Sequence, residues 1–161
     1  MEIERKFTLK RLPKNLSQYE CKVIEQGYLC KSPTVRIRKS NNDYILTYKS
    51  KYGIDTSGTD VLMSNEVEVP LDQAGYEHLK TKIDDKIVEK RRYIIPLENG
   101  LKVELDIFEG YLKGLILAEV EFPTKEEAEA FVMPDWFDQD VSADSRYKNT
   151  YLSQVESYEA M

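Results

Sequence analysis

Charged and apolar side chains alternate along the first residues of the chain, MEIERKF. Side chains two apart in a β-strand project to the same side, so Glu2, Glu4 and Lys6 would share one face of a strand. Similar pairs recur along the chain, and most of them place two acids or two bases side by side. They are Arg36 and Arg38, Thr47 and Lys49, Glu66 and Glu68, Lys90 and Arg92, Glu104 and Asp106, and Glu119 and Glu121.

These pairs favour a binding site over a solvated surface. A one-sided sheet in water explains the alternation, but neighbouring carboxylates repel one another unless a cation lies between them, and paired arginines need an anion. A polyphosphate with divalent metal ions meets both needs. Arginine and lysine bind phosphate oxygens, and carboxylates bind Mg²⁺ or Mn²⁺. We therefore expect the charged faces to point into the fold and the apolar faces to point outward.

Other kinds of chemistry find little support in the sequence. Cys21 and Cys30 match no zinc or redox motif, and His78 is the only histidine. Catalysis would then depend on carboxylates, amines, guanidiniums or a metal. The net charge of -6 argues against a general binder of nucleic acid or membrane surfaces. The charged N-terminus, the lack of a long apolar run and the two unpaired thiols predict a cytoplasmic protein without a signal peptide.

The elements that must position these residues are short strands separated by turns. The 161 residues predict a single domain, residues 1–161, with a closed or sandwiched antiparallel sheet of about eight strands. Asn99-Gly100 is typical of a hairpin. Apolar outer faces would receive helices or form a homodimer contact, and the sequence leaves both open. Strands are expected at Ile3–Leu9, Glu20–Leu29, Thr34–Lys39, Tyr44–Lys49, Asn65–Val69, Ile87–Ile95, Leu101–Phe108 and Ile116–Phe122, and helices at Asp72–Ile83, Lys125–Met133 and Ser145–Ala160.

The opening Glu2-Ile3-Glu4-Arg5-Lys6 resembles the ExExK motif of CYTH domains, the triphosphate tunnel metalloenzymes. The resemblance covers almost the whole chain, in the family's order, and the tail is similar to that of short bacterial members. It implies a mainly β, α+β fold: an eight-stranded antiparallel barrel with helices packed outside and triphosphate bound within. The further matching segments are Val35–Arg38, Leu46–Lys49, Glu66–Glu68, Glu89–Tyr93, Glu104–Asp106, Glu119–Glu121 and Asp140–Leu152.

The resemblance also implies roles for the charged residues. Glu2, Glu4 and Lys6 would be catalytic. Substrate would be held by Lys6, Arg36, Arg38, Lys49, Lys90, Arg92, Arg146 and Lys148, and Mg²⁺ or Mn²⁺ by Glu2, Glu4, Glu66, Glu68, Glu104, Asp106, Glu119 and Glu121. Two features depart from the family pattern: Leu62–Asn65 lacks the basic residue that often precedes the middle Glu-x-Glu, and the loop from Ser50 to Asp60 carries no base-reading signature.

Three functions remain open at this point. We favour a metal-dependent phosphohydrolase that cleaves a small linear triphosphate, most simply inorganic triphosphate. A CYTH-type adenylyl cyclase, which converts ATP to cyclic AMP and pyrophosphate, needs the same metal and phosphate site, and thiamine triphosphatase is a closer variant. A module that only binds polyphosphate would not need so many carboxylates.

Overall fold

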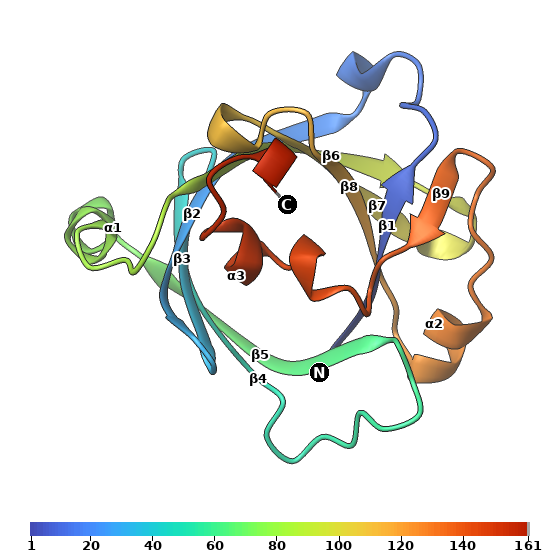
Figure 1. Ribbon diagram of the computed structural model, residues 1–161, viewed down its shortest axis with the longest axis horizontal. Coiled ribbons are helices and arrows are strands. Elements are labelled where there is room, and N and C mark those ends of the chain that lie inside the picture. Colours follow the sequence, from blue (N-terminus) through green and yellow to red (C-terminus); the bar gives the residue numbers. More distant parts are fainter. Residues whose placement is uncertain (161) are drawn as a thin grey trace.

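The computed structural model describes residues 1–160 and consists mainly of antiparallel β-strands (Figure 1). The sheet has the order β5-β4-β3-β2-β6-β7-β8-β1-β9, and a further pairing of β5 with β1 closes the first eight strands into a barrel. The predicted eight-stranded antiparallel barrel is therefore confirmed. The strands are β1 (Glu2–Leu9), β2 (Glu20–Lys31), β3 (Thr34–Ser40), β4 (Asp43–Ser50), β5 (Leu62–Leu71), β6 (Val88–Pro96), β7 (Lys102–Phe108), β8 (Ile116–Glu121) and β9 (Phe137–Asp140).

The barrel closes through a short contact between β1 and β5. Glu2, Ile3 and Glu4 pair with Ser64, Met63 and Leu62, and further along the same edge β1 pairs with β9. Beyond Ser64, one edge of β5 has no strand partner within residues 1–160. A proline lacks the N–H group that a paired edge would use, so this free edge tolerates Pro70. The prediction that the strand ends before Pro70 is wrong, because β5 continues to Leu71.

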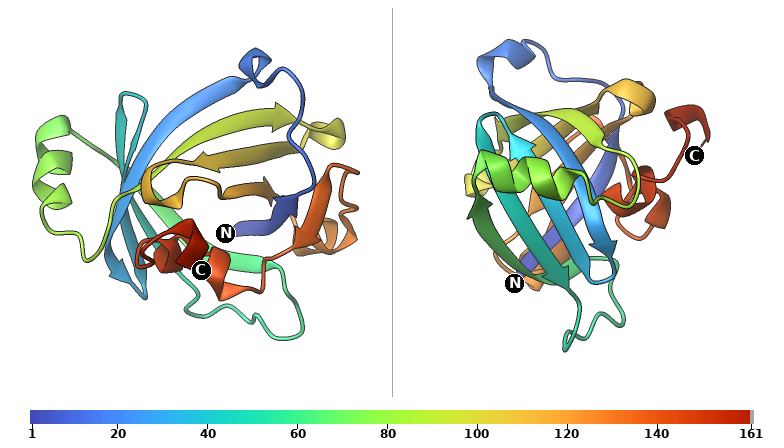
Figure 2. Two further views of the ribbon diagram at one scale, coloured as in Figure 1. Left: turned by 45° about the horizontal axis from the view of Figure 1, so that its top comes forward. Right: turned by 90° about the vertical axis from the view of Figure 1, so that its left-hand side faces the viewer.

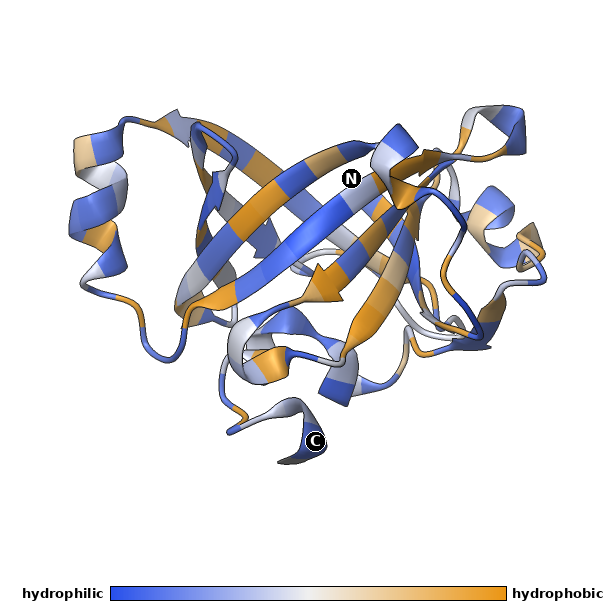
Figure 3. Cartoon of the chain, turned by 90° about the horizontal axis from the view of Figure 1, so that it is seen from above, coloured by the Kyte–Doolittle hydropathy of each residue, from blue (hydrophilic) through white to orange (hydrophobic). Residues whose placement is uncertain are grey.

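The larger of two hydrophobic clusters lies outside the barrel wall. Ile3, Leu105 and Val120 project outward from β1, β7 and β8, and they pack with Phe137 of β9 and Ala128 of α2 (Lys125–Ala130). Along the strands, hydrophilic and hydrophobic residues alternate (Figure 3). The outward apolar faces predicted from the sequence are thus confirmed, and α2 covers part of them. Burial of these apolar side chains favours folding through the hydrophobic effect, which the charged interior cannot supply.

Two helices begin where the sequence predicts and end earlier. The carboxylate of Asp72 accepts a hydrogen bond of 2.6 Å from the backbone N–H of Gly75 and so caps the N-terminus of α1 (Gln73–Lys80). The helix packs against β3 and β4. Tyr76 is its buried residue. Helix α2 stops before Phe131, whose backbone is extended. Phe131 still meets the core, because its ring packs on those of Phe7 and Phe122, but it does so from an extended backbone and not from a continued helix.

The prediction of one long C-terminal helix is wrong. Residues 145–160 form three short pieces, and they lie across the middle of the barrel in Figure 1. Leu152 packs against Val88, Phe108 and Leu117, which project into the barrel at this end. The tail therefore covers the apolar part of one end of the interior instead of the outer face. The pieces are η4 (Ser145–Tyr147), α3 (Asn149–Leu152) and η5 (Tyr158–Ala160).

Connections between strands include three other 3-10 turns, at η1 (Leu16–Gln18), η2 (Glu98–Gly100) and η3 (Gly110–Leu112). The predicted Asn99-Gly100 hairpin is confirmed, because both residues have positive φ, at 67° and 74°. Two side views show the barrel with α1 and the C-terminal segment on different sides (Figure 2). No helix within residues 1–160 has the length and apolarity needed to span a membrane.

We predict that Phe137→Ala destabilises the protein by about 3–5 kcal/mol, because the ring is almost fully buried and packs on Phe7 with centroids 4.8 Å apart. Urea unfolding followed by circular dichroism measures this loss. Val132→Ala is the control, since Val132 is 85% exposed and should change stability by less than about 0.5 kcal/mol. A loss at Phe137 as small as that of the control would show that β9 is not needed to cover the core.

Candidate active site

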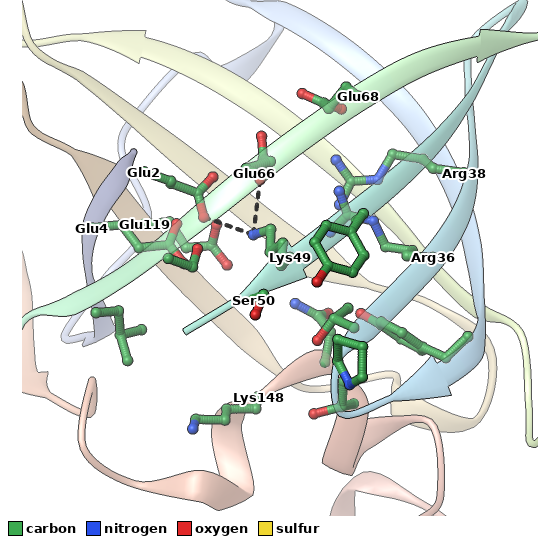
Figure 4. Close-up of a pocket in the computed structure, with 18 of the residues that line it drawn as sticks. Glu2, Glu4, Arg36, Arg38, Lys49, Ser50, Glu66, Glu68, Glu119 and Lys148 are labelled. Atoms are coloured by element: carbon green, nitrogen blue, oxygen red, sulfur yellow. Dashed lines mark hydrogen bonds and ion pairs between the residues drawn. The ribbon is translucent and has the colours of Figure 1, made fainter. Parts of the chain in front are cut away.

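A cavity of about 1050 Å³ occupies the barrel interior, and most of the charged residues predicted from the sequence line it (Figure 4). Strand register explains this convergence. Lys6 lies opposite Glu119, which lies opposite Glu104, while Arg36 lies opposite Thr47, which lies opposite Glu68. The predicted residues that line the cavity are Glu2, Glu4, Lys6, Arg36, Arg38, Lys49, Glu66, Glu68, Arg92, Glu104, Glu119, Glu121 and Lys148.

Arg92 organises one wall of the cavity. Its guanidinium donates to both oxygens of Asp106, at 2.7 and 2.8 Å, and to Glu104 at 2.9 Å. The ammonium group of Lys90 lies 2.8 Å from the same Asp106 carboxylate, and both side chains are buried. Burial would raise the pKa of Asp106, but the positive charges of Arg92 and Lys90 outweigh it and lower the pKa. Asp106 is therefore a fixed counter-ion.

This arrangement separates Asp106 and Lys90 from the other predicted site residues. Neither lines the cavity, because their charges face each other within the wall. The carboxylate of Asp106 is already held by two cations, so a metal would have to displace an arginine to reach it. The structure thus does not bring Asp106 together with the other predicted metal ligands.

Two lysines connect the acidic side chains of β1 to neighbouring strands. Lys49 lies 2.7 Å from Glu2 and 3.2 Å from Glu66. Burial lowers the pKa of Lys49, but the charges of Glu4 and Glu2 outweigh it and raise the pKa. Lys6 lies 3.4 Å from Glu119 and donates a hydrogen bond of 2.8 Å to the backbone carbonyl of Tyr147. Burial raises the pKa of Glu119, but Lys6, Arg92 and Lys90 together lower it well below its usual range.

Arg36 and Arg38 on β3 have no carboxylate partner within residues 1–160. Arg38 donates to the side-chain oxygen of Gln26 at 2.8 Å, and Arg36 donates to the hydroxyl of Thr47 at 3.2 Å. The Nε of Arg36 is buried without any hydrogen-bond partner. Burial lowers the pKa of Arg38 to about 9, and the positive charges of Arg36 and Arg92 act in the same direction. A buried donor without a partner is costly, so this wall favours an anionic ligand.

Carboxylates without a cation gather on the opposite side of the cavity. Glu4 is joined to no labelled residue by a hydrogen bond or ion pair in Figure 4, and burial, together with the charges of Glu119 and Glu2, raises its pKa to about 8. Burial and the neighbouring acids Glu2, Glu104 and Glu66 also raise the pKa of Glu121. Crowded carboxylates with raised pKa values suit a divalent cation, which is their natural counter-charge.

The carboxylates do not form a ready-made metal cage. Among residues 1–160, no three acidic, histidine or cysteine side chains converge closely enough to hold a metal ion together. Mg²⁺ usually binds one or two carboxylates and completes its shell with water and substrate phosphates. The donor set therefore fits a metal ion that enters with a phosphate ligand.

The tail contributes some site residues and not others. Lys148 lines the cavity, and Asn149 accepts a long hydrogen bond of 3.4 Å from Lys90. Arg146 does not line it: its side chain is 55% exposed and pairs with Asp144 at 2.7 Å. The predicted role of Arg146 in substrate binding thus has no support from its position.

Sequence reasoning missed the polar residues that support the arginines. Gln26 and Tyr28 on β2 are buried, and the amide of Gln26 donates to the Tyr28 hydroxyl at 3.2 Å. Their spacing of two residues on a strand that pairs with Arg36 and Arg38 is a signal that could have found them. No such signal exists for Asn149, because the tail lacks strand periodicity.

Two curated proteins named inorganic triphosphatase resemble this chain along nearly its whole length. An inorganic triphosphatase from Nitrosomonas europaea is 37% identical over 156 residues, which cover 94% of this chain and 96% of that protein. The chain belongs to the inorganic triphosphatase family. A second inorganic triphosphatase, from Acetivibrio thermocellus, is 34% identical over 94% of this chain and 92% of its own length.

Solved structures agree with this family assignment. The crystal structure of the inorganic triphosphatase NE1496 superposes with a TM-score of 0.69 at 34% identity and covers 98% of this chain and 97% of that chain. HpAC1 from Hippeastrum shares the fold at 18% identity, with a TM-score of 0.54 and coverage of 80% of this chain and 83% of its own. No family model matches the chain.

We predict that Asp106→Asn destabilises the protein by about 3–5 kcal/mol, because it leaves Arg92 and Lys90 buried with too little negative charge. Chemical denaturation measures the change. Glu109→Gln is the control: Glu109 pairs with Arg91 at 3.2 Å on the surface, where an ion pair contributes less than about 1 kcal/mol. Equal effects of the two variants would contradict a structural role for Asp106.

Proposed function

We propose that this protein is an inorganic triphosphatase of the CYTH, or triphosphate tunnel, class that hydrolyses its substrate inside the barrel. The observation that carries the proposal is the pair Arg36 and Arg38, which faces the cavity without a carboxylate partner while unpaired carboxylates lie opposite. The names of the relatives support the same substrate. Two free thiols fit the cytoplasm as its location.

The chain's own residues would bind and orient the triphosphate. Arg36 and Arg38 present guanidinium donors to phosphate oxygens, and the unpartnered Nε of Arg36 gains the hydrogen bond that it lacks. Lys6 contacts both Glu119 and a backbone carbonyl. It can turn toward the phosphate, because Glu119 would keep Arg92 as a cation partner. The phosphate chain is thereby held between the arginine wall and the carboxylates of β1.

Hydrolysis then needs a proton acceptor and charge neutralisation. Water bonds to a terminal phosphorus, the phosphoanhydride bond breaks, and orthophosphate and diphosphate leave. Glu2 would take the proton, since burial raises its pKa and makes it a better base than an ordinary glutamate. Glu4 and Glu121 would hold Mg²⁺ or Mn²⁺ together with the substrate, and the ion would supply positive charge to the phosphate oxygens.

The test of the function is phosphate release from inorganic triphosphate, ATP and thiamine triphosphate, with Mg²⁺, with Mn²⁺ and with EDTA, together with an assay for cyclic AMP. We expect the fastest release from inorganic triphosphate and none with EDTA. Formation of cyclic AMP and pyrophosphate from ATP would instead assign the protein to the cyclase class.

We predict that Arg36→Ala lowers kcat/KM for triphosphate by at least about 100-fold, as expected when a preorganised donor to the developing charge is lost. The matched control is Arg91→Ala, because Arg91 points away from the cavity and pairs with Glu109 on the surface. Steady-state kinetics measures both. Activity of Arg36→Ala close to that of the control would exclude this arginine wall as the phosphate site.

We also predict that triphosphate with Mg²⁺ stabilises the protein more than triphosphate with EDTA. A ligand at 100 times its Kd adds roughly 2.7 kcal/mol, which is about 5–10 °C in Tm for a chain of this size. In Glu4→Gln the additional shift due to Mg²⁺ should be lost, because an amide is a poorer metal ligand. Differential scanning calorimetry measures the shift, and a Mg²⁺ effect that persists in Glu4→Gln would argue against Glu4 as a ligand.

A further inference from the structure

Lys6 lies where one edge of strand β1 changes its partner. On the other edge β1 pairs with β8, and Lys6 is opposite Glu119. On the edge in question, the pairing with β5 ends at Glu4, and the pairing with β9 begins at Phe7. Lys6 thus falls between two partner strands, and its backbone N–H and carbonyl need hydrogen-bond partners from elsewhere.

The segment that follows β9 supplies these partners. The backbone N–H of Lys6 donates a hydrogen bond of 2.8 Å to the hydroxyl of Ser142, and the backbone N–H of Val141 donates one of 2.8 Å to the carbonyl of Lys6. The ammonium group of Lys6 donates to the backbone carbonyl of Tyr147, also at 2.8 Å. One short segment, residues 141–147, therefore holds both the backbone and the side chain of Lys6.

Ser142 is itself held firmly in place. Its side chain is buried, and its backbone N–H donates to a carboxylate oxygen of Asp140 at 2.8 Å. The other oxygen of Asp140 pairs with Arg5 at 2.8 Å. Arg5 precedes Lys6 on β1 and lies on the outer face of that strand, where it also contacts α2. The contacts from Arg5 through Asp140 and Ser142 thus connect the outer face of β1 to the lysine that faces the cavity.

The hydroxyl of Ser142 is placed to act on a ligand through Lys6 and not directly. Lys6 lines the cavity, whereas Ser142 does not. The ammonium group of Lys6 lies between the Tyr147 carbonyl and Glu119, from which it is 3.4 Å away. Lysine has a long, flexible side chain, so the position of its backbone decides which atoms the ammonium group reaches. Misplacement of a group by about 1 Å can cost on the order of 100-fold in rate.

We propose that Ser142 is a positioning residue for triphosphate hydrolysis, because its hydroxyl fixes the backbone of Lys6 and thereby aims the ammonium group at the phosphate chain. This inference rests on the proposed function, since it assigns Lys6 to the phosphate. Removal of the hydroxyl then lowers activity only while Lys6 is present. If Ser142 merely stabilised the fold, its removal would have the same effect on activity with and without the lysine.

The experiment is a double-mutant cycle on kcat/KM for triphosphate with Mg²⁺, in the wild type, Ser142→Ala, Lys6→Met and the double variant. We expect Ser142→Ala to lower kcat/KM at least about 10-fold in the wild type and less than about 2-fold in Lys6→Met. The matched control is Ser153→Ala, because Ser153 is also buried in the tail but donates to the carbonyl of Thr150. Equal losses from Ser142→Ala in both backgrounds, or a loss no larger than that of the control, overturn the positioning role.

A measurement without ligand separates failure of this inference from failure of the proposed function. The side-chain nitrogen NMR signal of Lys6, assigned by its absence in Lys6→Met, should shift in Ser142→Ala and stay in place in Ser153→Ala. An unchanged signal in Ser142→Ala overturns the inference. If the wild type does not hydrolyse triphosphate, the proposed function fails, and the NMR comparison still decides whether Ser142 positions Lys6.

Urea unfolding shows whether each variant is folded. Should Ser142→Ala be unfolded, Ser142→Cys takes its place in both measurements, because a thiol is close to a hydroxyl in size but is a weak hydrogen-bond acceptor. The same results are then expected, and the same results overturn the inference.

Discussion

The contact of Arg92 with Asp106, Glu104 and Glu119 determines the charge distribution of the whole interior. One guanidinium on β6 holds three carboxylates from β7 and β8. Because these three acids already have a cation partner, they are not available to the arginines of β3. Among residues 1–160, the buried Arg36 and the half-buried Arg38 have no carboxylate partner, a state that costs free energy until an anion arrives. The acids thus pair with Arg92 and not with Arg36 or Arg38, and this leaves the arginines of β3 available to an anion.

A charged interior also explains why the larger hydrophobic cluster lies outside the barrel. Side chains that alternate along a strand can bury only one apolar face, and here the inner face is reserved for charges. The apolar face must then be covered from outside, as α2 and β9 do over β1, β7 and β8. Arg5 secures this cover from the outer face of β1, since it donates to the carbonyls of Ala128 and Phe131 at 2.8 and 3.1 Å and pairs with Asp140. The inner face of β1 therefore carries residues of the candidate active site, and its outer face holds α2 and β9 in place.

The sequence predicts the strands and the inward residues well, because both depend on local alternation. Each expected strand is present, and the paired charges of β1, β3, β5 and β8 all reach the cavity. What local pattern cannot reveal is which acid meets which base. The difference between Asp106, fixed within the wall, and Glu4, unpaired in the cavity, depends on register between strands and on burial. The tail and β9 escaped prediction because their position is decided by the apolar surfaces they cover and not by periodicity of their own.

The division of charge along the tunnel also bears on how an anion would enter and leave. Glu4, Glu68 and Glu121, on β1, β5 and β8, have no ion pair among residues 1–160, whereas Lys51 and Lys148 line the cavity on the side of the tail. A polyanion is attracted to the lysine side and repelled by the acidic one, so the field favours entry past Lys51 and Lys148. The same lysines would hold a released phosphate weakly, because Lys51 is exposed to solvent and water screens its charge. A phosphate that moves from Arg36 and Arg38 toward Lys148 and the exposed Lys51 would therefore break its contacts in stages and not all at once.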